Sequence, residues 1–434
     1  MEVEKKRSTN KKKNANRKSD THENTITKKS SIIVERKQIS RPQKTKKVKK
    51  KNAEQLQNIT QYFDYNLLAI VVFLLCFGLV MLYSTSSYSA QIKFNDSMYF
   101  FRRQAIFSAL SIGGMLFVSM IPYHFYARLA KIAYYISFIL MALVRTPLGI
   151  DAYGARRWIR LPGGMQMQPA EVTKLAIVIF IPLLICQAGR FIKYWKVFFR
   201  ILAWGAVAAA GVFLLTENLS TAVIVMGMVC VMLFVAHPKT APFVTIGAGG
   251  MSLVAIGVII LDKLMDTSKS FRLRRILVWL HPEEYASEGG FQVMQGLYAI
   301  GAGGFFGKGL GNSAQKMIIP EAQNDMILAI ICEELGVFGV LVLLTLFGML
   351  LYRLMFIAQN APDMYGSLIV TGIFAHIALQ VVLNIAVVLN VIPTTGITLP
   401  FISYGGTSII FLMAEMGIAL GVSGRIRFES ESKQ

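Results

Sequence analysis

The stretch Ile318–Gly339, IIPEAQNDMILAIICEELGVFG, joins polar chemistry directly to a long apolar run. Pro320 suits the first turn of a helix, where its missing N–H would be unpaired in any case. If the helix begins there, Glu321 and Asp325 are four residues apart and share one face of its opening turns. The helix dipole favours such acids by under about 1 kcal/mol each, which explains Glu321 better than Asp325. Since carboxylates at a membrane surface are usually kept for function, Asp325 is a candidate functional residue.

Apolar runs extend from this stretch through most of the chain. Of its 434 residues 54% are hydrophobic and only 16% are charged, and the mean hydropathy is +0.51. Segments long enough to span a bilayer, about 20 residues each, start near Asn66, Met98, Ile132, Pro169, Ile201, Glu217, Ala241, Ala322, Gly366 and Pro400. The sequence therefore predicts an all-α polytopic membrane protein of about ten transmembrane helices. Its large extracytoplasmic loop, residues 262–321, lies between the seventh and eighth helices.

The first 63 residues have a different composition. Up to Thr60 there are 19 lysines and arginines against six acidic residues, which supplies 13 of the net charge of +21. Such a segment has too little apolar surface to fold and is expected to be disordered. Its charge marks the cytoplasmic side and suits attachment to anionic lipid. It lacks interleaved aromatics, so no nucleic-acid partner is indicated, and it has no apolar core typical of a signal peptide.

Counting spans from a cytoplasmic N-terminus places the end of the chain, residues 429–434, in the cytoplasm as well. The membrane domain then covers residues 64–428. Six arginines fall on the outer side against the positive-inside bias, although long loops cross regardless of charge: Arg156, Arg157, Arg160, Arg272, Arg274 and Arg275. An anionic substrate on the outer face is the simplest reason for them. The four cysteines lie in apolar spans and the five histidines are scattered, so neither disulfides nor a histidine metal centre is indicated.

The outer loop contains two distinctive segments. SFRLRRILVWLHP, residues 270–282, has helical spacing of arginines and apolar residues, typical either of a helix lying in the membrane interface or of a structural brace. Seven glycines follow between Gly296 and Gly311. Glycine lets a backbone approach a ligand closely, and exposed N–H groups can hold phosphate. The signal matters because Lys308 lies within it.

Two further outer segments carry polar residues into apolar surroundings. In the first, Glu171 and Lys174 follow the helix-opening Pro169 at i and i+3, which suggests a buried pair, although the lysine could also snorkel. Trp158 is typical of a membrane interface, or it acts with Arg157 toward phosphate. In the second segment Ser403 precedes Tyr-Gly-Gly, where small residues can also serve helix packing.

Three long motifs occur in order: GARRWI with QPAEVTKLA, then QGLYAIGAGGFFGKGLGNSAQK with IPEAQNDMILAIICEELG, then NVIPTTGITLPFISYGG. Together they resemble the FtsW/RodA/SpoVE family of polytopic peptidoglycan glycosyltransferases. The resemblance covers about residues 64–427. The GLGNSAQK and EELG segments are more similar to the division-type FtsW, or to its sporulation relative, than to RodA.

The resemblance implies polymerisation of lipid II into glycan strands on the outer face of the bacterial cytoplasmic membrane, for cell division or a sporulation septum. Asp325 matches the family's catalytic aspartate. Substrate-binding roles fall to Trp158, Glu171, Lys174, Glu321 and Ser403, while Arg102, Arg157, Lys174 and Lys308 are candidates to face the pyrophosphate. The chain departs from the family at Glu217–Thr221, which reads ENLST where many members have Pro-Asp-Leu-Gly-Thr, and at Ala170, where a serine is usual.

Glycosyl transfer requires a base for the acceptor hydroxyl and stabilisation of the departing pyrophosphate. Sequence leaves open whether Asp325 takes the proton or holds a divalent cation, Mg²⁺ or Mn²⁺. The expected partners are lipid II with its growing glycan chain, a class B penicillin-binding protein and other division proteins. Alternatives are a lipid II flippase, a RodA-type elongation polymerase, and a scaffold whose polar residues only pack helices. Clustering of polar residues at the outer mouth favours catalysis over a path through the membrane.

Overall fold

The computed structural model describes residues 59–152, 155–160, 166–239, 243, 247 and 271–429. The basic tail and most of the span expected from Ala241 lie outside these residues, so the predictions for them stay untested.

Long apolar helices make up most of the described chain, and the predicted fold class is confirmed. Eight of the described helices are long and apolar enough to cross a membrane. They are α2 (Tyr65–Phe94), α3 (Tyr99–Met120), α4 (Tyr123–Leu143), α5 (Pro169–Ala188), α6 (Trp195–Thr216), α7 (Leu219–Ala236), α11 (Ile327–Asn360) and α12 (Met364–Val388). A shorter apolar helix, α13 (Ser408–Ser423), follows. The chain is a multi-pass helical membrane protein, while the total of ten spans and the position of the large loop stay predictions.

Four helix starts lie five or more residues from their predicted positions. Helix α11 begins at Ile327 rather than near Ala322, and α13 begins at Ser408 rather than near Pro400, because turns and irregular backbone occupy the residues between. Helix α4 begins at Tyr123 rather than near Ile132, and α6 begins at Trp195 rather than near Ile201. Basic residues precede both apolar runs, and Arg128 and Lys196 are exposed on the opening turns of these helices. A helix continues beyond its apolar part wherever its charged side chains reach water, so hydropathy alone places such ends too late.

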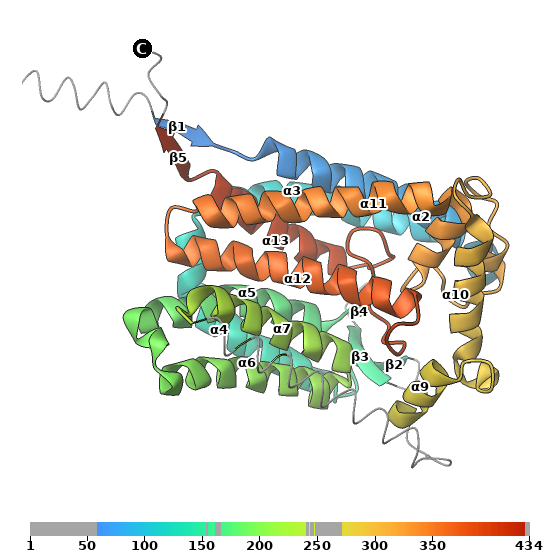
Figure 1. The fold of residues 1–434 in the computed structure, drawn as a ribbon, viewed down its shortest axis with the longest axis horizontal. Helices are drawn as coiled ribbons and strands as arrows, with labels where there is room; N and C mark the ends of the chain where they lie inside the picture. Colours follow the sequence, from blue (N-terminus) through green and yellow to red (C-terminus); the bar gives the residue numbers. More distant parts are fainter. Residues whose placement is uncertain are drawn as a thin grey trace, which may run out of the picture. The chain divides into compact units, whose positions relative to one another are not determined.

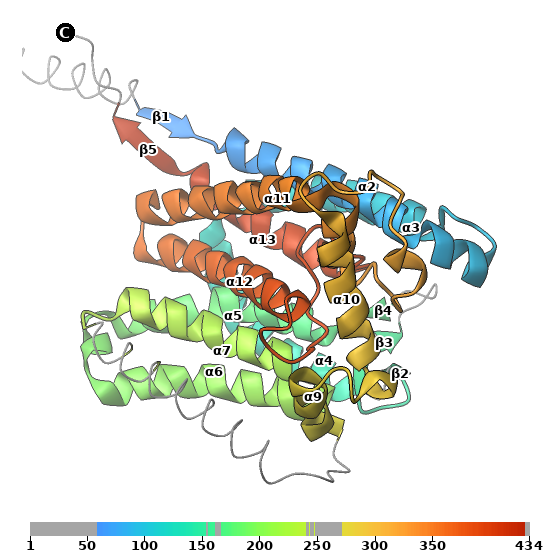
Figure 2. The same ribbon diagram turned by 45° about the vertical axis from the view of Figure 1, so that its right-hand side comes forward.

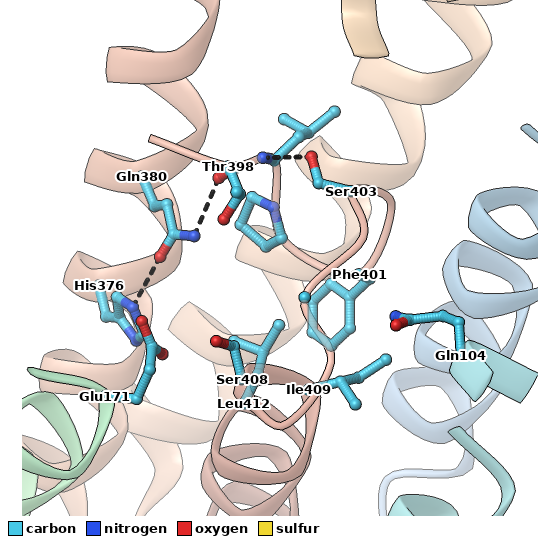
Figure 3. A pocket seen from close by; sticks show the side chains of 13 residues that line it. Gln104, Glu171, His376, Gln380, Thr398, Phe401, Ser403, Ser408, Ile409 and Leu412 are labelled. Atoms are coloured by element: carbon cyan, nitrogen blue, oxygen red, sulfur yellow. Dashed lines mark hydrogen bonds between the residues drawn. The ribbon is translucent and has the colours of Figure 1, made fainter. Parts of the chain in front are cut away.

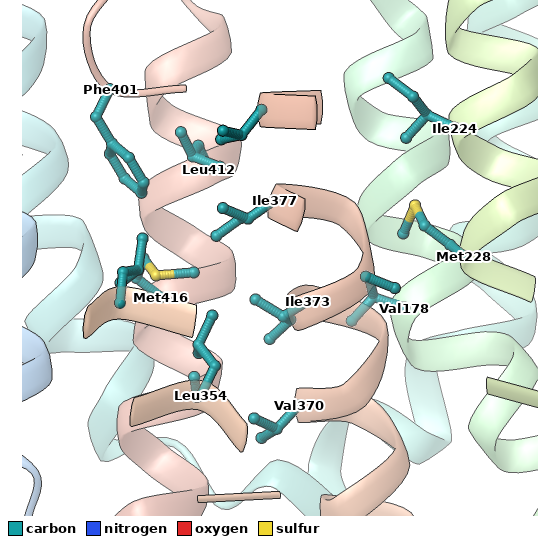
Figure 4. Close-up of a cluster of buried hydrophobic side chains, with 14 of the residues drawn as sticks. Val178, Ile224, Met228, Leu354, Val370, Ile373, Ile377, Phe401, Leu412 and Met416 are labelled. Atoms are coloured by element: carbon teal, nitrogen blue, oxygen red, sulfur yellow. The ribbon is translucent and has the colours of Figure 1, made fainter. Parts of the chain in front are cut away.

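Helix α12 lies at the centre of the helical packing. It contacts α5, α7, α11 and α13, and Figure 4 shows Ile373 and Ile377 of α12 among side chains of these neighbours, including Val178, Met228 and Leu354. A helix that is apolar all round is typically buried by its neighbours. The few polar side chains of α12 are therefore held inside the protein.

The two ends of the helices carry different structures (Figures 1 and 2). At one end β1 (Ile59–Tyr62) pairs antiparallel with β5 (Ile426–Glu429), so the first and last described strands lie together. At the other end are a three-stranded sheet and two helices: β2 (Gly149–Ala152), β3 (Ala155–Arg160), β4 (Gln166–Met167), α9 (Phe271–Leu280) and α10 (Gly290–Gly303). Short 3₁₀ turns cover Gly189–Lys193, Ala286–Glu288 and Gln315–Met317. The predicted outer residues gather at the second end.

The glycine-rich segment after α10 lies against a break in α11. Gly336 has φ 67° and ψ −168°, which interrupts the helix. Residues 304–309 and 333–338 exchange four backbone hydrogen bonds of 2.9–3.1 Å across this break. A Cβ on Gly303 would lie 1.9 Å from the carbonyl oxygen of Cys332, so only glycine permits this approach. The N–H groups of Lys308 and Gly309 donate to carbonyl oxygens of α11. The prediction that exposed N–H groups of this segment hold phosphate is therefore wrong for these two residues.

Candidate active site at the loop end of the helices

Asp325 lies in a run of turns ahead of α11, and the predicted helical opening is wrong. Helix α11 begins at Ile327. Glu321, directly after Pro320, has a left-handed φ of 49°, and its carbonyl oxygen accepts the Asn324 N–H at 2.9 Å. This local turn replaces the first helical bonds, so Glu321 and Asp325 do not share a helix face. The Glu321 carboxylate lies 3.5 Å from the ammonium of Lys93 and is partly exposed.

Four side chains or backbone positions from distant segments surround the Asp325 carboxylate. Gln292 of α10 donates from Nε2 to Asp325 Oδ1 at 3.4 Å. Gly396, with φ 70°, separates the other oxygen from Arg157 of β3: a Cβ there would lie 4.0 Å from Asp325 Oδ2 and 3.8 Å from Arg157 Nη1. Arg275 of α9 is close enough to act electrostatically on both Asp325 and Arg157. The predicted Asp325 and Arg157 thus lie on either side of Gly396, and Arg275 and Gln292 act on Asp325 directly.

The electrostatics make Asp325 a readily protonated acid. Surrounding protein atoms crowd the carboxylate and raise its pKa, and the charge of Glu321 raises the pKa further. The backbone N–H of Asp325, Arg275 and Gln292 act in the opposite direction without reversing the shift. Burial lowers the pKa of Arg157, and the neighbouring Arg275 lowers it as well. A carboxylate with a raised pKa beside two guanidinium groups is suited to accept a proton next to a developing negative charge.

The loop of residues 389–398, which contains Gly396, is anchored through its carbonyl oxygens. Five side chains donate to it at 2.7–3.4 Å: Trp279 to Asn390, Arg275 to Thr394, Ser220 to Thr395, Asn384 to Ile397 and Gln380 to Thr398. The donors come from α7, α9 and α12. Because two of them belong to α9, this helix braces the loop, which favours the second of the two roles predicted for it. The loop that carries Gly396 is therefore held in place beside Asp325.

A second cluster of polar side chains is buried beneath this loop. It contains the predicted Glu171–Lys174 pair, which the structure confirms. Lys174 Nζ lies 2.9 Å from Glu171 Oε1 and 3.3 Å from Gln380 Oε1. His376 contacts the same Gln380 oxygen through Nε2 at 2.9 Å and Glu415 through Nδ1 at 2.7 Å. Three helices, α5, α12 and α13, thus share one network of paired charges and amides.

A small polar cavity, with room for water-sized occupants, adjoins this network (Figure 3). Glu171, Gln380 and Ser403 line it together with Gln104 of α3. The Ser403 hydroxyl accepts the Leu399 N–H at 2.8 Å, so this predicted site residue shapes the loop that bounds the cavity. Gln104 is buried and its Oε1 has no hydrogen-bond partner among the described residues. Buried polar atoms rarely stay unpaired, so this cavity is suited to a polar occupant or water.

The remaining predicted site residues lie elsewhere. Lys308 pairs with Glu333 of α11 at 2.7 Å, and Arg102 pairs with Asp96 on an exposed surface. Trp158 is half-buried on β3, opposite Ile150 of β2. The structure therefore gives Lys308 and Arg102 acidic partners of their own rather than placing them against Asp325.

Several site residues were missed by the sequence predictions. His376, Gln380 and Asn384 are spaced by four in an apolar helix, a stripe of polar residues on one face that the sequence does show. Gln292 gave no such signal. At the family departure in residues 217–221, Asn218 caps α7 by accepting the Thr221 N–H at 3.1 Å, and Ser220 anchors the loop. The substituted segment thus keeps a structural role.

A divalent cation at Asp325 can be tested against the residues present. Among the described residues no three His, Cys, Asp or Glu side chains converge on one point. Asp325 supplies one carboxylate, and two guanidinium groups share its surroundings. Mg²⁺ is commonly held by one or two carboxylates, water and substrate phosphates. The residues present therefore fit such an ion if Asp325 supplies one ligand and water and substrate phosphates supply the others.

Comparison with known proteins gives a consistent picture. A family model described as "Cell cycle protein" (FtsW/RodA/SpoVE) matches residues 65–427. Stage V sporulation protein E of Bacillus subtilis (strain 168) is 39% identical over 368 residues, which is 84% of this chain and 98% of that protein. A probable peptidoglycan glycosyltransferase FtsW of Trichlorobacter lovleyi is 37% identical over 367 residues, 84% of this chain and 94% of the relative.

Two solved structures are also similar. One, described as "Structural coordination of polymerization and crosslinking by a peptidoglycan synthase complex", matches with a TM-score of 0.67 and 29% identity, covering 83% of this chain and 97% of the other. The rod shape determining protein RodA of Thermus thermophilus matches with a TM-score of 0.57 and 26% identity, covering 83% and 96%.

Proposed function

Because this chain belongs to the FtsW/RodA/SpoVE family of cell cycle proteins, we propose that it is a peptidoglycan glycosyltransferase that polymerises lipid II. The observation that carries this proposal is the placement of Asp325, with its raised pKa, near Arg275, with Arg157 across Gly396 from it. The relatives named as glycosyltransferases provide the reaction class. The chemistry of the three side chains suits that reaction.

The reaction forms a bond between the acceptor sugar's 4-hydroxyl oxygen and the donor's anomeric carbon, and it breaks the bond from that carbon to the lipid pyrophosphate. Asp325 takes the hydroxyl proton as the new bond forms, and its raised pKa makes it a stronger base than an ordinary aspartate. Arg157 and Arg275 lie where the pyrophosphate's growing charge can be balanced. Attack from the face opposite the leaving group inverts the anomeric centre.

A bound divalent cation would supply further charge neutralisation for the pyrophosphate. Asp325 would then hold it, together with phosphate oxygens and water, as the alternative to taking the proton itself. No step assigned to Arg157 or Arg275 depends on it.

The small polar cavity beside Glu171 and Lys174 suits water or one polar group of the substrate. Gln104 offers an unpaired oxygen there, and the paired charges nearby are already neutralised. This pairing argues against a flippase, because a path for a pyrophosphate needs cations that are not bound to protein carboxylates. A scaffold would not need the convergence of Asp325, Arg157 and Arg275.

The proposed setting is the cytoplasmic membrane of a bacterium, with both termini in the cytoplasm and the Asp325 end outside. The pairing of β1 with β5 supports termini on one side. Division, or a sporulation septum, is favoured over RodA-type elongation because of the relatives named FtsW and stage V sporulation protein E. A class B penicillin-binding protein is the proposed partner, since one similar structure concerns coordinated polymerization and crosslinking. Other division proteins would join them, and the basic tail would bind anionic lipid.

The decisive experiment is lipid II polymerisation by the purified full-length protein, alone and with a class B penicillin-binding protein. Glycan strands of increasing length are expected, with a higher rate in the complex. Transfer of labelled lipid II between leaflets of sealed vesicles, without any polymer, would instead identify a flippase.

A further inference from the structure

Asn384 of α12 connects the peptide of Asp325 to the loop of residues 389–398. Its side chain is fully buried. The amide nitrogen Nδ2 donates to the Asp325 carbonyl oxygen at 3.0 Å and to the Ile397 carbonyl oxygen at 2.7 Å. One NH₂ group therefore uses both of its hydrogens to join the two segments that flank the Asp325–Gly396 contact.

We infer that Asn384 is a positioning residue for glycosyl transfer, which holds the Asp325 peptide against the Ile397 peptide and thereby fixes the Asp325 carboxylate next to Gly396. The inference rests on the proposed function, in which Asp325 is the catalytic residue. Asn384 itself is placed behind the site, where its amide nitrogen contacts backbone oxygens.

The four other loop anchors differ from Asn384 in one respect. Trp279, Ser220 and Gln380 each donate to a loop carbonyl, and Arg275 does so while also acting electrostatically on Asp325. Asn384 donates hydrogen bonds both to the loop and to the Asp325 backbone. Asp325 also lies in turns rather than inside α11, so regular helical hydrogen bonding does not fix its position. An external donor is needed there, and Asn384 supplies it.

Loss of this donor should affect the rate more than substrate binding. Misplacement of a reacting group by about 1 Å can lower a rate by about 100-fold. The arginines and the cavity, which contact substrate in the proposed mechanism, do not bond to Asn384 in the described structure. We therefore expect kcat to fall while KM for lipid II changes little.

The test uses the full-length protein and lipid II, with Asn384→Leu as the main variant. Leucine keeps the branching and the number of side-chain heavy atoms of asparagine and removes both donors. Ser220→Ala is the matched control, because it removes a donor to the neighbouring carbonyl of Thr395, at 3.0 Å, without touching Asp325. If Asn384→Leu does not fold by thermal unfolding, Asn384→Ser replaces it, since a hydroxyl keeps one donor.

The expected result is a kcat at least tenfold below wild type for folded Asn384→Leu, a KM within threefold, and a kcat within threefold for Ser220→Ala. Hydrogen exchange should quicken at residues 321–326 in Asn384→Leu and stay unchanged there in Ser220→Ala. A folded variant with a kcat within threefold of wild type would overturn the inference, as would an equal loss in both variants. If Asp325→Asn polymerises normally in the same assay, the catalytic assignment fails instead.

Discussion

Lys308 Nζ lies 2.7 Å from Glu333 Oε1, so a lysine that the sequence motifs suggest for the pyrophosphate holds a fully buried carboxylate instead. The same carboxylate accepts hydrogen bonds from the Ser313 hydroxyl and from the backbone N–H groups of Ala314 and Gln315. Glu333 therefore binds the segment between α10 and Asp325 to α11 by accepting hydrogen bonds from that segment, as a helix-capping side chain accepts N–H groups.

This geometry predicts that Glu333→Leu destabilises the protein more than Lys308→Met. Removing Glu333 leaves several donors unpaired, each costing about 1–3 kcal/mol if it stays buried. Removing Lys308 leaves Glu333 with its other donors, and the lysine side chain is already 40% exposed. Thermal unfolding of both variants in the same detergent gives the order. Equal losses in the two proteins would contradict this assignment of Glu333.

Asp325→Asn is expected to fold normally and to make no glycan polymer. The substitution keeps the shape of the side chain and removes its capacity to accept the acceptor's proton. Polymer length on gels, with expression and thermal unfolding as controls, measures the outcome. Substantial polymer from this variant would refute the catalytic role.

The raised pKa of Asp325 also predicts a pH-dependent difference in stability. A carboxyl whose pKa is higher in the folded state binds its proton more tightly there, so its ionisation opposes folding. The contribution is favourable below the unfolded value of 3.8 and is lost as pH rises through the folded pKa. Asp325→Asn should therefore be more stable than wild type at neutral pH, and the gap should narrow toward pH 4. A stability difference between the two proteins that does not change with pH would contradict a raised pKa for Asp325 in the folded state.

The Glu171–Lys174 pair has two separable roles. If it is only structural, Glu171→Gln or Lys174→Met alone should cost about 3–5 kcal/mol and the double variant should recover much of it. Because the pair borders the cavity and joins Gln380, we expect the double variant to recover stability and remain inactive. Thermal unfolding and polymerisation are measured on all three proteins. Recovery of activity in the double variant would leave a structural pair.

Deletion of Met1–Gln57 should leave polymerisation in detergent close to normal and weaken binding to vesicles that contain anionic lipid. The tail supplies 13 of the net charge of +21, and the family match begins at residue 65. Polymerisation assays and vesicle sedimentation at two salt concentrations test both parts. Loss of catalysis in a folded truncated protein would place the tail in the enzyme's working core.

Hydropathy predicted the membrane class because long apolar runs have few alternatives, and it misplaced the start of α4 because Tyr123 and Arg128 extend a helix beyond its apolar part. Motif resemblance identified Asp325, but the local rule for Pro320 gave the wrong conformation, since a left-handed turn forms at Glu321 and delays the helix to Ile327. Arg157 was identified and Gln292 was not. Contacts between segments so distant in sequence depend on how the helices pack, which local patterns do not specify.

The break in α11 at Gly336 has a consequence for biosynthesis. A membrane span with an interrupted helix leaves backbone groups unpaired in lipid, where each costs several kcal/mol. In the folded protein residues 304–309 satisfy them, and these residues are translated before residues 333–338. The earlier segment is therefore already synthesised when α11 enters the membrane, and it can pair with the interrupted helix as soon as that helix forms. A chain with residues 304–309 moved behind α11 should insert poorly even though every span is unchanged.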